Sequence, residues 1–497
     1  MTAPLLLALD QGTTSTRAIL FDAAGRELAT AGRPLRQSYP ADGWVEHDPE
    51  EIFQASAAVL RQALERSGRD AGVVAAIGVT NQRETVVVWD RASGRPIAPA
   101  IVWQDQRTAA VCERLLGDGA EPEVTEKTGL LLAPYFSATK LAWLLDETPG
   151  ARAAAEAGRL LAGTIDAWVI WRLTGGRVHA TDATNASRTL LFDLERQTWD
   201  EELCRLFRVP PGLLPEVKDC AGDYGETAAE LLGRPVPIRG VAGDQQAALM
   251  GQGCIRPGEM KATYGTGCFL LLNTGERRPR SAARLLSTVA ARVGGRTTYA
   301  LEGSIFIAGA AIQWVNEQLG VVGGPAAVEA LAGTAKPDHG VIFVPAFTGL
   351  GAPWWSSEAR GAVTGLTRDT GLAEIAAAAF DAAAWQTDDL VEAMRGDAPD
   401  AFGTGAVLRI DGGMAVSARF PQRLADLTGL PVARARYPET TALGAALFAG
   451  LGAGVFSTLE EAAQARPAAE DIRPALAPEH RAGMRARWRA AVARTAA

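Results

Sequence analysis

The stretch LLLALDQGTTSTRAILF (residues 5–21) decides the fold of this 497-residue chain. It reads as an apolar run, a polar turn over Asp10–Thr16 with a single glycine, and a second apolar run over Arg17–Phe21. A second turn at 22–25 leads into Arg26–Ala31, so the pattern predicts strand, turn, strand, turn, strand. An amphipathic helix over Glu50–Ser67 and two β-rich runs follow, and a helix is also expected over Ala151–Leu161. Strands that alternate with helices predict an α/β fold.

A weaker copy of this pattern begins near residue 260. Met260–Tyr264 is strand-like, Gly265-Thr-Gly267 is a polar turn, and Cys268–Leu272 is strand-like again. A similar unit at half the chain's length favours an internal duplication over a chance repeat. The expected halves are residues 1–251 and 252–497, with the boundary near 251–256.

Composition excludes several classes of protein. Hydrophobic residues make up 47% and charged residues 21%, which is ordinary for a globular chain. The net charge of −8 argues against a nucleic-acid partner. The arginine-rich tail at 480–497 is better explained as a surface helix. The five cysteines form no CxxC pair and the four histidines have no metal-ligand spacing, which predicts a reduced, cytoplasmic protein.

Two apolar stretches resemble membrane or export signals. Thr440–Leu459 is uncharged, but glycines at 444, 450, 452 and 454 interrupt it, so a buried helix and a glycine-rich turn are expected there. The run that ends at Leu9 lacks a basic leader and stops at Asp10. We expect a buried strand there and no membrane span.

The first turn is a candidate phosphate site. Gly12 lets backbone N–H groups approach an anion closely, and the neighbouring side chains add hydroxyl and guanidinium donors. Asp10, at the end of a buried strand, has the chemistry to hold Mg²⁺. A plain hairpin with ordinary turn residues is the alternative. The candidate phosphate contacts are Thr13, Thr14, Ser15 and Arg17.

The second turn, Tyr264–Cys268, has the same chemistry, so two turns are placed to hold the phosphates of one nucleotide between the halves. Neither turn matches GxxxxGK[ST], which excludes a P-loop. The glycines at 412–413 end another apolar run and permit close approach of a flat ligand such as a nucleoside; an ordinary turn is the alternative.

Asp244 stands where a helix should begin, after the β-like stretch Pro237–Ala242. One interpretation is a helix N-cap, for which aspartate is favoured. The other is a catalytic base that accepts a hydroxyl proton during phosphoryl transfer. The sequence of this segment alone does not decide between the two interpretations.

Arg83 and Glu84 lie side by side between apolar runs, and buried charges need partners. Other protein groups or the hydroxyls of a polyol would satisfy them. Trp103 and Tyr135 would supply an apolar wall for a carbon chain, although each alone is also explained as core.

Taken together, these segments resemble the FGGY carbohydrate kinase family, and within it the branch that acts on glycerol. The resemblance runs from Leu9 to about Phe456. NQRET (81–85) and PYFS (134–137) are the most discriminating stretches, since sugar kinases of the family typically carry Met-His in place of Arg83-Glu84. Other matching stretches are GWVEHDP (43–49), TNASRTLLF (184–192), AGDQQAAL (242–249), TYGTGCFLL (263–271), YALEGSIFIAGAAIQW (299–314) and DGG (411–413).

The resemblance implies two actin/Hsp70-like (ribonuclease H-like) α/β domains around a deep catalytic cleft, and ATP- and Mg²⁺-dependent phosphorylation of glycerol to sn-glycerol 3-phosphate. Asp244 would be the general base and Asp10 would position Mg²⁺. The implied substrate contacts are Arg83, Glu84, Trp103, Tyr135, Asp244, Gln245 and Phe269. The implied nucleotide contacts are Thr13, Thr14, Ser15, Arg17, Thr266, Gly309, Gln313, Gly413 and Ser417. A homodimer or homotetramer is also expected.

The chain departs from the family in its nucleotide and regulatory segments. Ser417 stands where relatives usually have an asparagine near the adenosine, and Phe420-Pro-Gln-Arg423 replaces an LMQ-like run. Proline at 421 would disturb a helix interior unless it lies in the first turn. Tyr224-Gly225 is not followed by the histidine that some relatives have phosphorylated, and only Gly233-Arg234 remains of the loop for fructose 1,6-bisphosphate. We expect neither control to operate.

Two other functions remain open from sequence. One is a kinase for another small triol or for a ketotriose such as dihydroxyacetone. The other is a nucleotide-gated binding protein without useful kinase activity, because one scaffold hosts several functions. Retention of Asp244 with Arg83 and Glu84 argues against the second.

Overall fold

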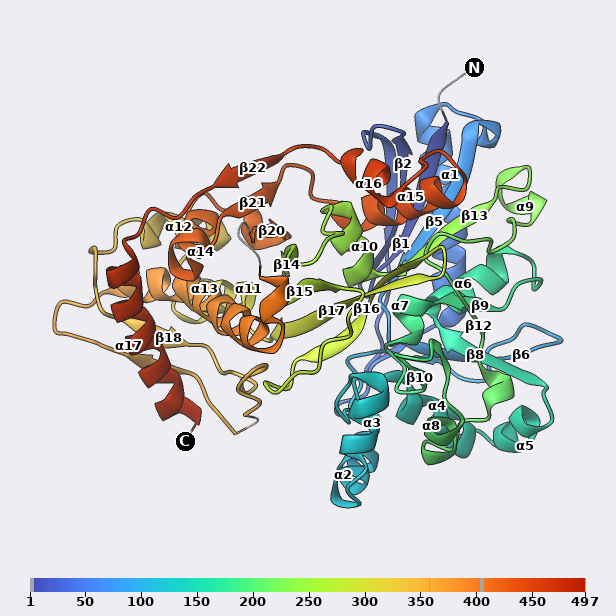
Figure 1. Cartoon of the computed structure of the whole chain (residues 1–497), viewed down its shortest axis with the longest axis horizontal. Helices are drawn as coiled ribbons and strands as arrows, with labels where there is room; N and C mark the ends of the chain where they lie inside the picture. Colours follow the sequence, from blue (N-terminus) through green and yellow to red (C-terminus); the bar gives the residue numbers. More distant parts are fainter. Residues whose placement is uncertain (1–3, 357, 403–405, 497) are drawn as a thin grey trace.

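A computed structural model describes residues 4–356, 358–402 and 406–496 of the chain and shows two large β-sheets, with helices and smaller sheets packed around them (Figure 1). The first sheet has the order β3-β2-β1-β5-β13. Strands β1 to β3 are antiparallel, and β5 and β13 run parallel to β1. The strands are β1 (Leu5–Gln11), β2 (Ser15–Asp22), β3 (Glu27–Pro34), β5 (Val74–Asn81) and β13 (Ile238–Gly243).

The second sheet contains the same arrangement. Its five inner strands have the order β17-β15-β14-β20-β21, with β14 and β15 antiparallel and β20 and β21 parallel to β14. The predicted repeat of strand, turn and strand is therefore confirmed, and the same order of strands extends it over both sheets. The strands are β14 (Met260–Tyr264), β15 (Cys268–Gly275), β17 (Arg296–Ile305), β20 (Leu408–Asp411) and β21 (Val432–Ala435), with β16 (Leu286–Val293) and β22 (Ala469–Ile472) at the edges.

Further elements surround each sheet. A four-stranded sheet, β4-β7-β6-β8, consists of β4 (Glu46–His47), β7 (Ala100–Ile101), β6 (Val86–Asp90) and β8 (Leu160–Thr164). The helices in the first half are α1 (Pro49–Ser67), α2 (Ala109–Gly117), α3 (Glu121–Thr128), α4 (Ser137–Glu147), α5 (Ala151–Glu156), α6 (Ile165–Leu173), α7 (Ala183–Ala186), α8 (Glu201–Leu206) and α9 (Ala229–Leu232). In the second half are α11 (Gly309–Gln318), α12 (Gly324–Ala332), α13 (Leu372–Asp397), α14 (Phe420–Thr428), α16 (Leu459–Gln464) and α17 (Pro478–Ala496). Short pairs complete the strands, namely β9 (Ala180–Asp182) with β12 (Glu216–Lys218), β10 (Phe192–Asp193) with β11 (Thr198–Trp199), and β18 (Ile342–Val344) with β19 (Ala362–Thr364).

Two helices join the halves. α10 (Asp244–Gly251) follows β13, and α15 (Thr440–Gly452) comes after β21 but packs on β1, β5 and β13 of the first sheet (Figure 1). The helices pack against each other, and a Cβ added to Gly444 would lie 1.7 Å from the carbonyl oxygen of Ala247, so only glycine permits this approach. Residues 440–452 therefore belong to the second half in sequence but to the first sheet in packing.

Most predicted elements are found, with one correction. The helix expected over Ala151–Leu161 ends at Glu156, because Gly158 takes the left-handed φ of 71° and Leu160 begins β8. The uncharged stretch from Thr440 is the buried helix α15 followed by a turn, as predicted. Pro421 lies in the first turn of α14, where it disturbs no backbone hydrogen bond. In the described part of the chain, every helix is too short or too polar to span a membrane.

Candidate active site

The ends of three parallel strands bring distant residues together between the two sheets. Asp10 lies near the end of β1, Arg83 follows β5 by two residues, and Asp244 directly follows β13. The strand register places Asp10 beside Thr80, and Thr80 beside Ala242. Since parallel strands end at the same edge of a sheet, these three predicted site residues share that edge, where ligands of open α/β sheets commonly bind.

Arg83 is the centre of the hydrogen-bond network at this edge. Its backbone takes a left-handed φ of 61°, uncommon for a non-glycine residue, and its side chain is only 2% exposed. The guanidinium donates from Nη1 to Glu302 Oε2 at 2.6 Å and from Nη2 to the Tyr135 hydroxyl at 3.1 Å. Its Nε lies 3.2 Å from Asp244 Oδ1, so one side chain links three groups.

A second buried arginine closes a ring of charges. Arg188 Nε donates to Glu84 Oε1 at 2.8 Å, and Arg188 Nη2 donates to Glu302 Oε1 at 2.8 Å. Arg83 and Glu302 complete the ring, and all four side chains are at most 2% exposed. Although burial alone would raise it, the guanidiniums of Arg188 and Arg83 lower the pKa of Glu302 to about 2. The ring, which we call the charge ring, thus pairs two buried arginines with two buried glutamates.

Asp244 is the first residue of α10, and Gly243 occupies the N-cap position. The N-cap interpretation of Asp244 is therefore wrong. Its carboxylate accepts the N–H of Gln245 at 2.7 Å and faces Arg83, and the side chain is 31% exposed. Burial raises its pKa, and Arg83 opposes this rise. The group is accessible and positioned by a buried cation, which suits a proton acceptor.

Asp10 lies beside the first turn in a negatively charged environment. Burial, together with the carboxylates of Asp244 and Glu439, raises its pKa to about 7, and Arg17 opposes the rise. Within the described residues its carboxylate has no hydrogen-bond partner or ion pair. Thr14 at the turn is exposed, and Gly12 N–H closes the turn on Ser15 O at 3.0 Å. This end therefore has excess negative charge next to free hydroxyl donors.

Three predicted aromatic side chains line the space around Arg83. Trp103 and Tyr135 pack edge to face with ring centroids 5.7 Å apart, and the ring of Phe269 on β15 lies 5.7 Å from the Arg83 guanidinium carbon. The indole of Trp103 donates to Thr13 Oγ1 at 2.9 Å. Trp103 thus connects the apolar wall directly to the first turn.

Gln245 is held by a buried lysine from the second sheet. Lys261 on β14 donates to Gln245 Oε1 and, at 3.0 Å, to Thr263 Oγ1. Burial lowers the pKa of Lys261, and the carboxylates of Asp411 and Asp244 oppose this. The amide of Gln245 is left 3.4 Å from Asp244 Oδ2, so its donor group faces the proposed base.

The second turn adjoins the N-terminus of α11. Gly309 N donates to Gly265 O at 3.1 Å, and Ala308 N donates to Thr266 O at 2.9 Å. A Cβ on Gly412 would lie 2.4 Å from Tyr264 O, so the glycines at 412–413 pack directly on this turn. Thr266, Gly309 and Gly413 are therefore brought together. Gln313, one turn further along α11, is exposed and donates to Glu317.

Two predicted nucleotide contacts already have protein partners. Ser417 Oγ donates to Glu329 Oε1 at 2.8 Å and accepts the N–H of Phe420, the first residue of α14, at 2.9 Å. Arg17 Nη1 donates to Glu439 Oε1 at 2.5 Å on the surface. A nucleotide would have to compete for both side chains.

Sequence reasoning missed Arg188, Lys261 and Glu302. The signal was present, because each is a charged residue within a largely apolar or small-residue segment, and such charges need partners. Glu302 lies 219 residues from Arg83, so no local pattern connects the pair.

The residues present fit a magnesium site of the kind completed by a ligand. In the residues that the structure describes, no cluster of three or more His, Cys, Asp or Glu side chains is arranged for a metal. Mg²⁺, however, is typically held by one or two carboxylates with waters and substrate phosphates. The unpaired Asp10 carboxylate, next to Asp244, supplies that donor set.

The chain is similar to known proteins over nearly its whole length. Residues 5–251 match the FGGY family of carbohydrate kinases, N-terminal domain, and residues 260–453 match its C-terminal domain. A glycerol kinase of Methylobacterium nodulans is 55% identical over 488 residues, covering 98% of this chain and 97% of that protein. A glycerol kinase of Alcanivorax borkumensis is 55% identical over 491 residues, covering 99% and 98%.

Solved structures show the same fold. The crystal structure of Plasmodium falciparum glycerol kinase with ADP superimposes with a TM-score of 0.94 at 34% identity and covers 99% of this chain and 98% of that one. A gluconate kinase from Lactobacillus acidophilus superimposes with a TM-score of 0.88 at 22% identity, covering 98% and 97%, and supports the fold alone.

Proposed function

This chain belongs to the FGGY family of carbohydrate kinases, and we propose that it phosphorylates glycerol with ATP to give sn-glycerol 3-phosphate and ADP. The observation that carries the proposal is the position of Asp244, an accessible carboxylate held by buried Arg83 beside the aromatic wall. The glycerol kinases that match nearly the whole chain support glycerol as the substrate.

In this mechanism Asp244 is the general base. Its carboxylate accepts the proton of a terminal glycerol hydroxyl while that oxygen bonds to the γ-phosphorus. The bond from the γ-phosphorus to the bridging oxygen breaks, and ADP leaves. The raised pKa of Asp244 favours this role, because a base works best when its pKa approaches the working pH.

The remaining hydroxyls of glycerol would be held by Arg83, Glu84, Tyr135 and Gln245. The charge ring fixes Arg83 and Glu84, so the donors and acceptors are in place before substrate arrives. Trp103 and Phe269 would pack on the carbon chain. Such preorganisation lowers the entropy cost of aligning two reactants.

The nucleotide would lie between the two turns. We propose that Thr13, Thr14, Ser15 and Arg17 bind phosphates from the first turn and Thr266 from the second, with Gly309, Gln313, Gly413 and Ser417 around the nucleoside. Asp10 would hold Mg²⁺, which supplies charge neutralisation of the phosphates when bound. The exposure of Thr14 and Thr266 supports these roles.

We further propose that residues 1–251 carry the polyol site and first turn, and residues 252–497 the second turn and adenosine site. A cytoplasmic location is supported by the requirement for ATP and by five free, buried cysteines. We also propose a homodimer or homotetramer. The exposed side chains of Tyr39, Leu366 and Val416 are available for such contacts.

The test is ATP consumption by the purified chain with Mg²⁺, with glycerol 3-phosphate measured directly. We expect turnover that requires glycerol, with a kcat/KM for glycerol well above that for dihydroxyacetone or other triols. A higher kcat/KM for another polyol would replace glycerol as the substrate. ATP binding without transfer to any polyol would instead favour the non-catalytic scaffold.

A further inference from the structure

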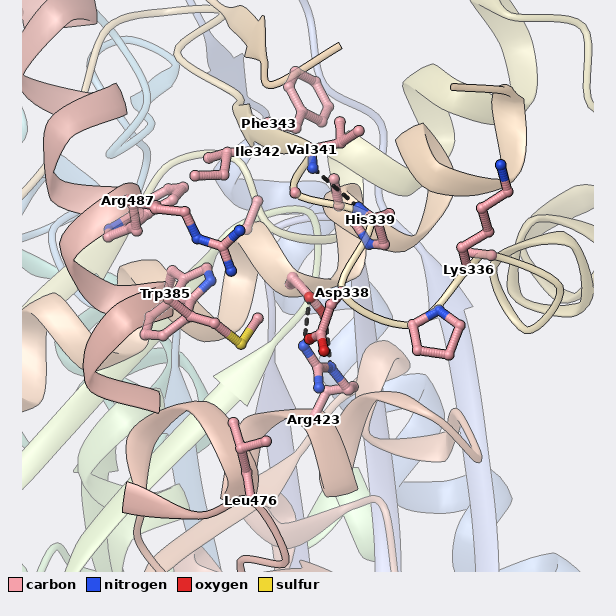
Figure 2. A pocket seen from close by; sticks show the side chains of 18 of the residues that line it. Lys336, Asp338, His339, Val341, Ile342, Phe343, Trp385, Arg423, Leu476 and Arg487 are labelled. Carbon is pink, nitrogen blue, oxygen red and sulfur yellow. Dashed lines mark hydrogen bonds and ion pairs between the residues drawn. The ribbon is translucent and has the colours of Figure 1, made fainter. Parts of the chain in front are cut away.

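A cavity of about 250 Å³ lies in the second half of the chain, apart from the candidate active site (Figure 2). Its walls are the segment 335–341, strand β18, and helices α13, α14 and α17. We call it the α13–α17 pocket. None of the residues predicted for glycerol or nucleotide lines it. Its volume is below the roughly 300–1,000 Å³ typical of sites for drug-sized ligands, so it suits a small molecule.

One side of the pocket is apolar and aromatic. Trp385 on α13, Trp488 and Met484 on α17, and Phe343 on β18 contribute to the lining. The Trp488 indole already donates to Asp389 at 2.8 Å, so its ring presents an apolar surface to a ligand. A flat apolar body is therefore the shape that this wall accepts.

The charges around the pocket do not balance. Asp381 accepts two hydrogen bonds from Arg423, at 2.9 and 2.6 Å, and Asp338 lies 2.8 Å from His480. Lys336 pairs with Asp369 and points away from the other labelled side chains (Figure 2). Asp381 is thus paired with Arg423, and Asp338 contacts the ring of His480.

The guanidiniums of two arginines in the pocket lining are not used in the pairs described above. Within the ranges that the structure describes, the side chains of Arg419 and Arg487 form no ion pair; Arg487 is exposed, whereas Arg419 is half-buried and its buried Nε has no hydrogen-bond partner. Arg487 reaches from α17 toward the segment at Gly340, where an added Cβ would lie 3.6 Å from its Nη1 (Figure 2). A buried unsatisfied guanidinium nitrogen is costly unless a partner is supplied.

His339 adds one more donor to this set. Its Nδ1 accepts the N–H of Val341 at 3.1 Å, which leaves Nε2 as the N–H of the neutral ring. Burial lowers the pKa of His339, in keeping with the neutral form. The lining thus offers two unpaired guanidiniums and a ring N–H beside an aromatic wall.

We propose that the α13–α17 pocket binds a small organic anion, a phosphate or carboxylate on a flat apolar body, with Arg419 and Arg487 as the anion ligands. Guanidiniums recognise both anions through paired N–H donors. The flat body would lie against Trp385 and Trp488.

The pocket is connected to the predicted adenosine contact by one carboxylate. Glu329 Oε1 accepts both the backbone N–H of Arg419 and the hydroxyl of Ser417, each at 2.8 Å. An anion that fixes Arg419 would therefore also fix the start of α14 and the orientation of Ser417. Resting on the proposed function, this linkage predicts a change in KM for ATP, with KM for glycerol unchanged.

Binding is tested first, without reference to catalysis. Phenyl phosphate is titrated by calorimetry into the full chain saturated with ADP, Mg²⁺ and glycerol, so that the active site is occupied. Benzoate, inorganic phosphate and neutral benzyl alcohol serve as comparisons. We expect phenyl phosphate or benzoate to bind at least tenfold more tightly than benzyl alcohol, and the better of the two distinguishes phosphate from carboxylate recognition.

The variants Arg419→Gln and Arg487→Gln should each weaken that binding at least tenfold. Arg489→Gln is the matched control, because Arg489 is exposed on the same helix but does not line the pocket. Thermal melts check that all three fold, and loss of a ligand-dependent fluorescence change in Trp385→Phe locates the site. No binding by the wild-type chain, or equal binding in both pocket variants, would overturn the proposal.

The kinetic linkage is measured separately. In the wild type, the bound anion should shift KM for ATP at least twofold, and the shift should vanish in Arg487→Gln. Binding without such a shift would overturn the linkage but leave the site. A chain that binds the anion but lacks glycerol-dependent turnover would count against the proposed function alone.

Discussion

The two ends of the candidate active site differ in how their buried charges are paired. At the polyol end, the side chains of Arg83, Arg188, Glu84 and Glu302 are nearly inaccessible and form ion pairs with one another. At the phosphate end, Asp10 has no partner among the described residues and is surrounded by further carboxylates. The charges of the first end are paired without ligand, whereas Asp10 at the second end has no cationic partner within contact distance among the described residues.

This difference matches the chemistry of the two ligands. Glycerol is neutral, so its site must present donors and acceptors without a net field, and a balanced ring does this. The phosphates of ATP arrive with cations, so a site with spare carboxylates holds the metal while hydroxyls and backbone N–H groups hold the oxygens. Asp244 lies between the ends and contacts Arg83, at the position where we propose that the proton is transferred.

The largest expected effect is on Asp244, where the two ends meet. Asp244→Asn should lower kcat about 10³-fold, because the amide cannot accept the hydroxyl proton. Fold and ATP binding should persist, since burial already disfavours the charged form. Direct assay of glycerol 3-phosphate, with Asp471→Asn as an exposed control on β22, measures this. Unchanged turnover would remove Asp244 from the role of base.

The next largest effect is expected from a substitution that disrupts the charge ring at the polyol end. Glu302→Gln leaves Arg83 and Arg188 with one buried carboxylate between them, which should cost about 3 kcal/mol of unfolding free energy. The KM for glycerol should also rise more than the KM for ATP. Urea denaturation checks the stability and initial rates check the two KM values.

A matched control for this change is Glu276→Gln. Glu276 pairs with Arg296 on the surface, with side chains 61% and 80% exposed, so its removal should change stability by less than about 1 kcal/mol. If Glu302→Gln were no more destabilising than Glu276→Gln, the charge ring would not be the organising feature of this end.

A third prediction concerns pH at the unbalanced end. The folded-state pKa of Asp10 is raised to about 7 from 3.8, so the folded protein binds this proton more tightly than the unfolded chain. Stability from this group is fully present below pH 3.8 and is lost as the pH rises to about 7. Without metal, Asp10→Asn should therefore be more stable than wild type at neutral pH, by of the order of 1 kcal/mol for this partly exposed group.

Thermal melts of wild type and Asp10→Asn between pH 4.5 and 8 test this sign. Mg²⁺ with ATP should stabilise the wild type more than the variant, because the variant lacks the carboxylate for the cation. The variant should also need more Mg²⁺ for half-maximal turnover. A variant that is less stable than wild type at neutral pH without metal would contradict the proposed excess of negative charge.

How much of this was predictable from sequence depends on the distance between partners. The two Gly/Thr turns and their flanking strands are local patterns, and both were found where predicted. The same order of five strands in each sheet accounts for the copy of the strand–turn–strand pattern near residue 260. Asp244 was located, but a strand followed by aspartate fits a cap as well as a base, and only the structure excludes the cap, because Gly243 takes that position.

Contacts between the halves were not predictable. Glu302 joins Arg83 across 219 residues, and α15 returns to the first sheet after the whole second sheet has formed. No sequence pattern around Glu302 indicates that Arg83 and Arg188 are its partners. The error at Ala151–Leu161 has the opposite cause: the local alanine-rich pattern favours helix throughout, but a left-handed Gly158 and pairing of β8 with β6 take its last residues.

The smallest expected effect distinguishes the function of Arg17 from its surface ion pair. Arg17 and Glu439 are 45% and 26% exposed, so breaking their pair should change stability by less than about 1 kcal/mol. If Arg17 binds phosphate, Arg17→Gln removes an anion ligand and leaves Glu439 unopposed beside Asp10. The KM for ATP should then rise about 3- to 10-fold, and less at high salt, where exposed charges are screened.

Glu439→Gln is the variant to compare with Arg17→Gln, because it frees the Arg17 side chain and removes negative charge from the phosphate end. It should leave the KM for ATP unchanged or lower it, so the two variants should move this KM in opposite directions. A purely structural ion pair would instead give both variants the same sign. Initial rates at two salt concentrations separate these outcomes, and equal increases in KM would mean that the phosphate end binds ATP without Arg17.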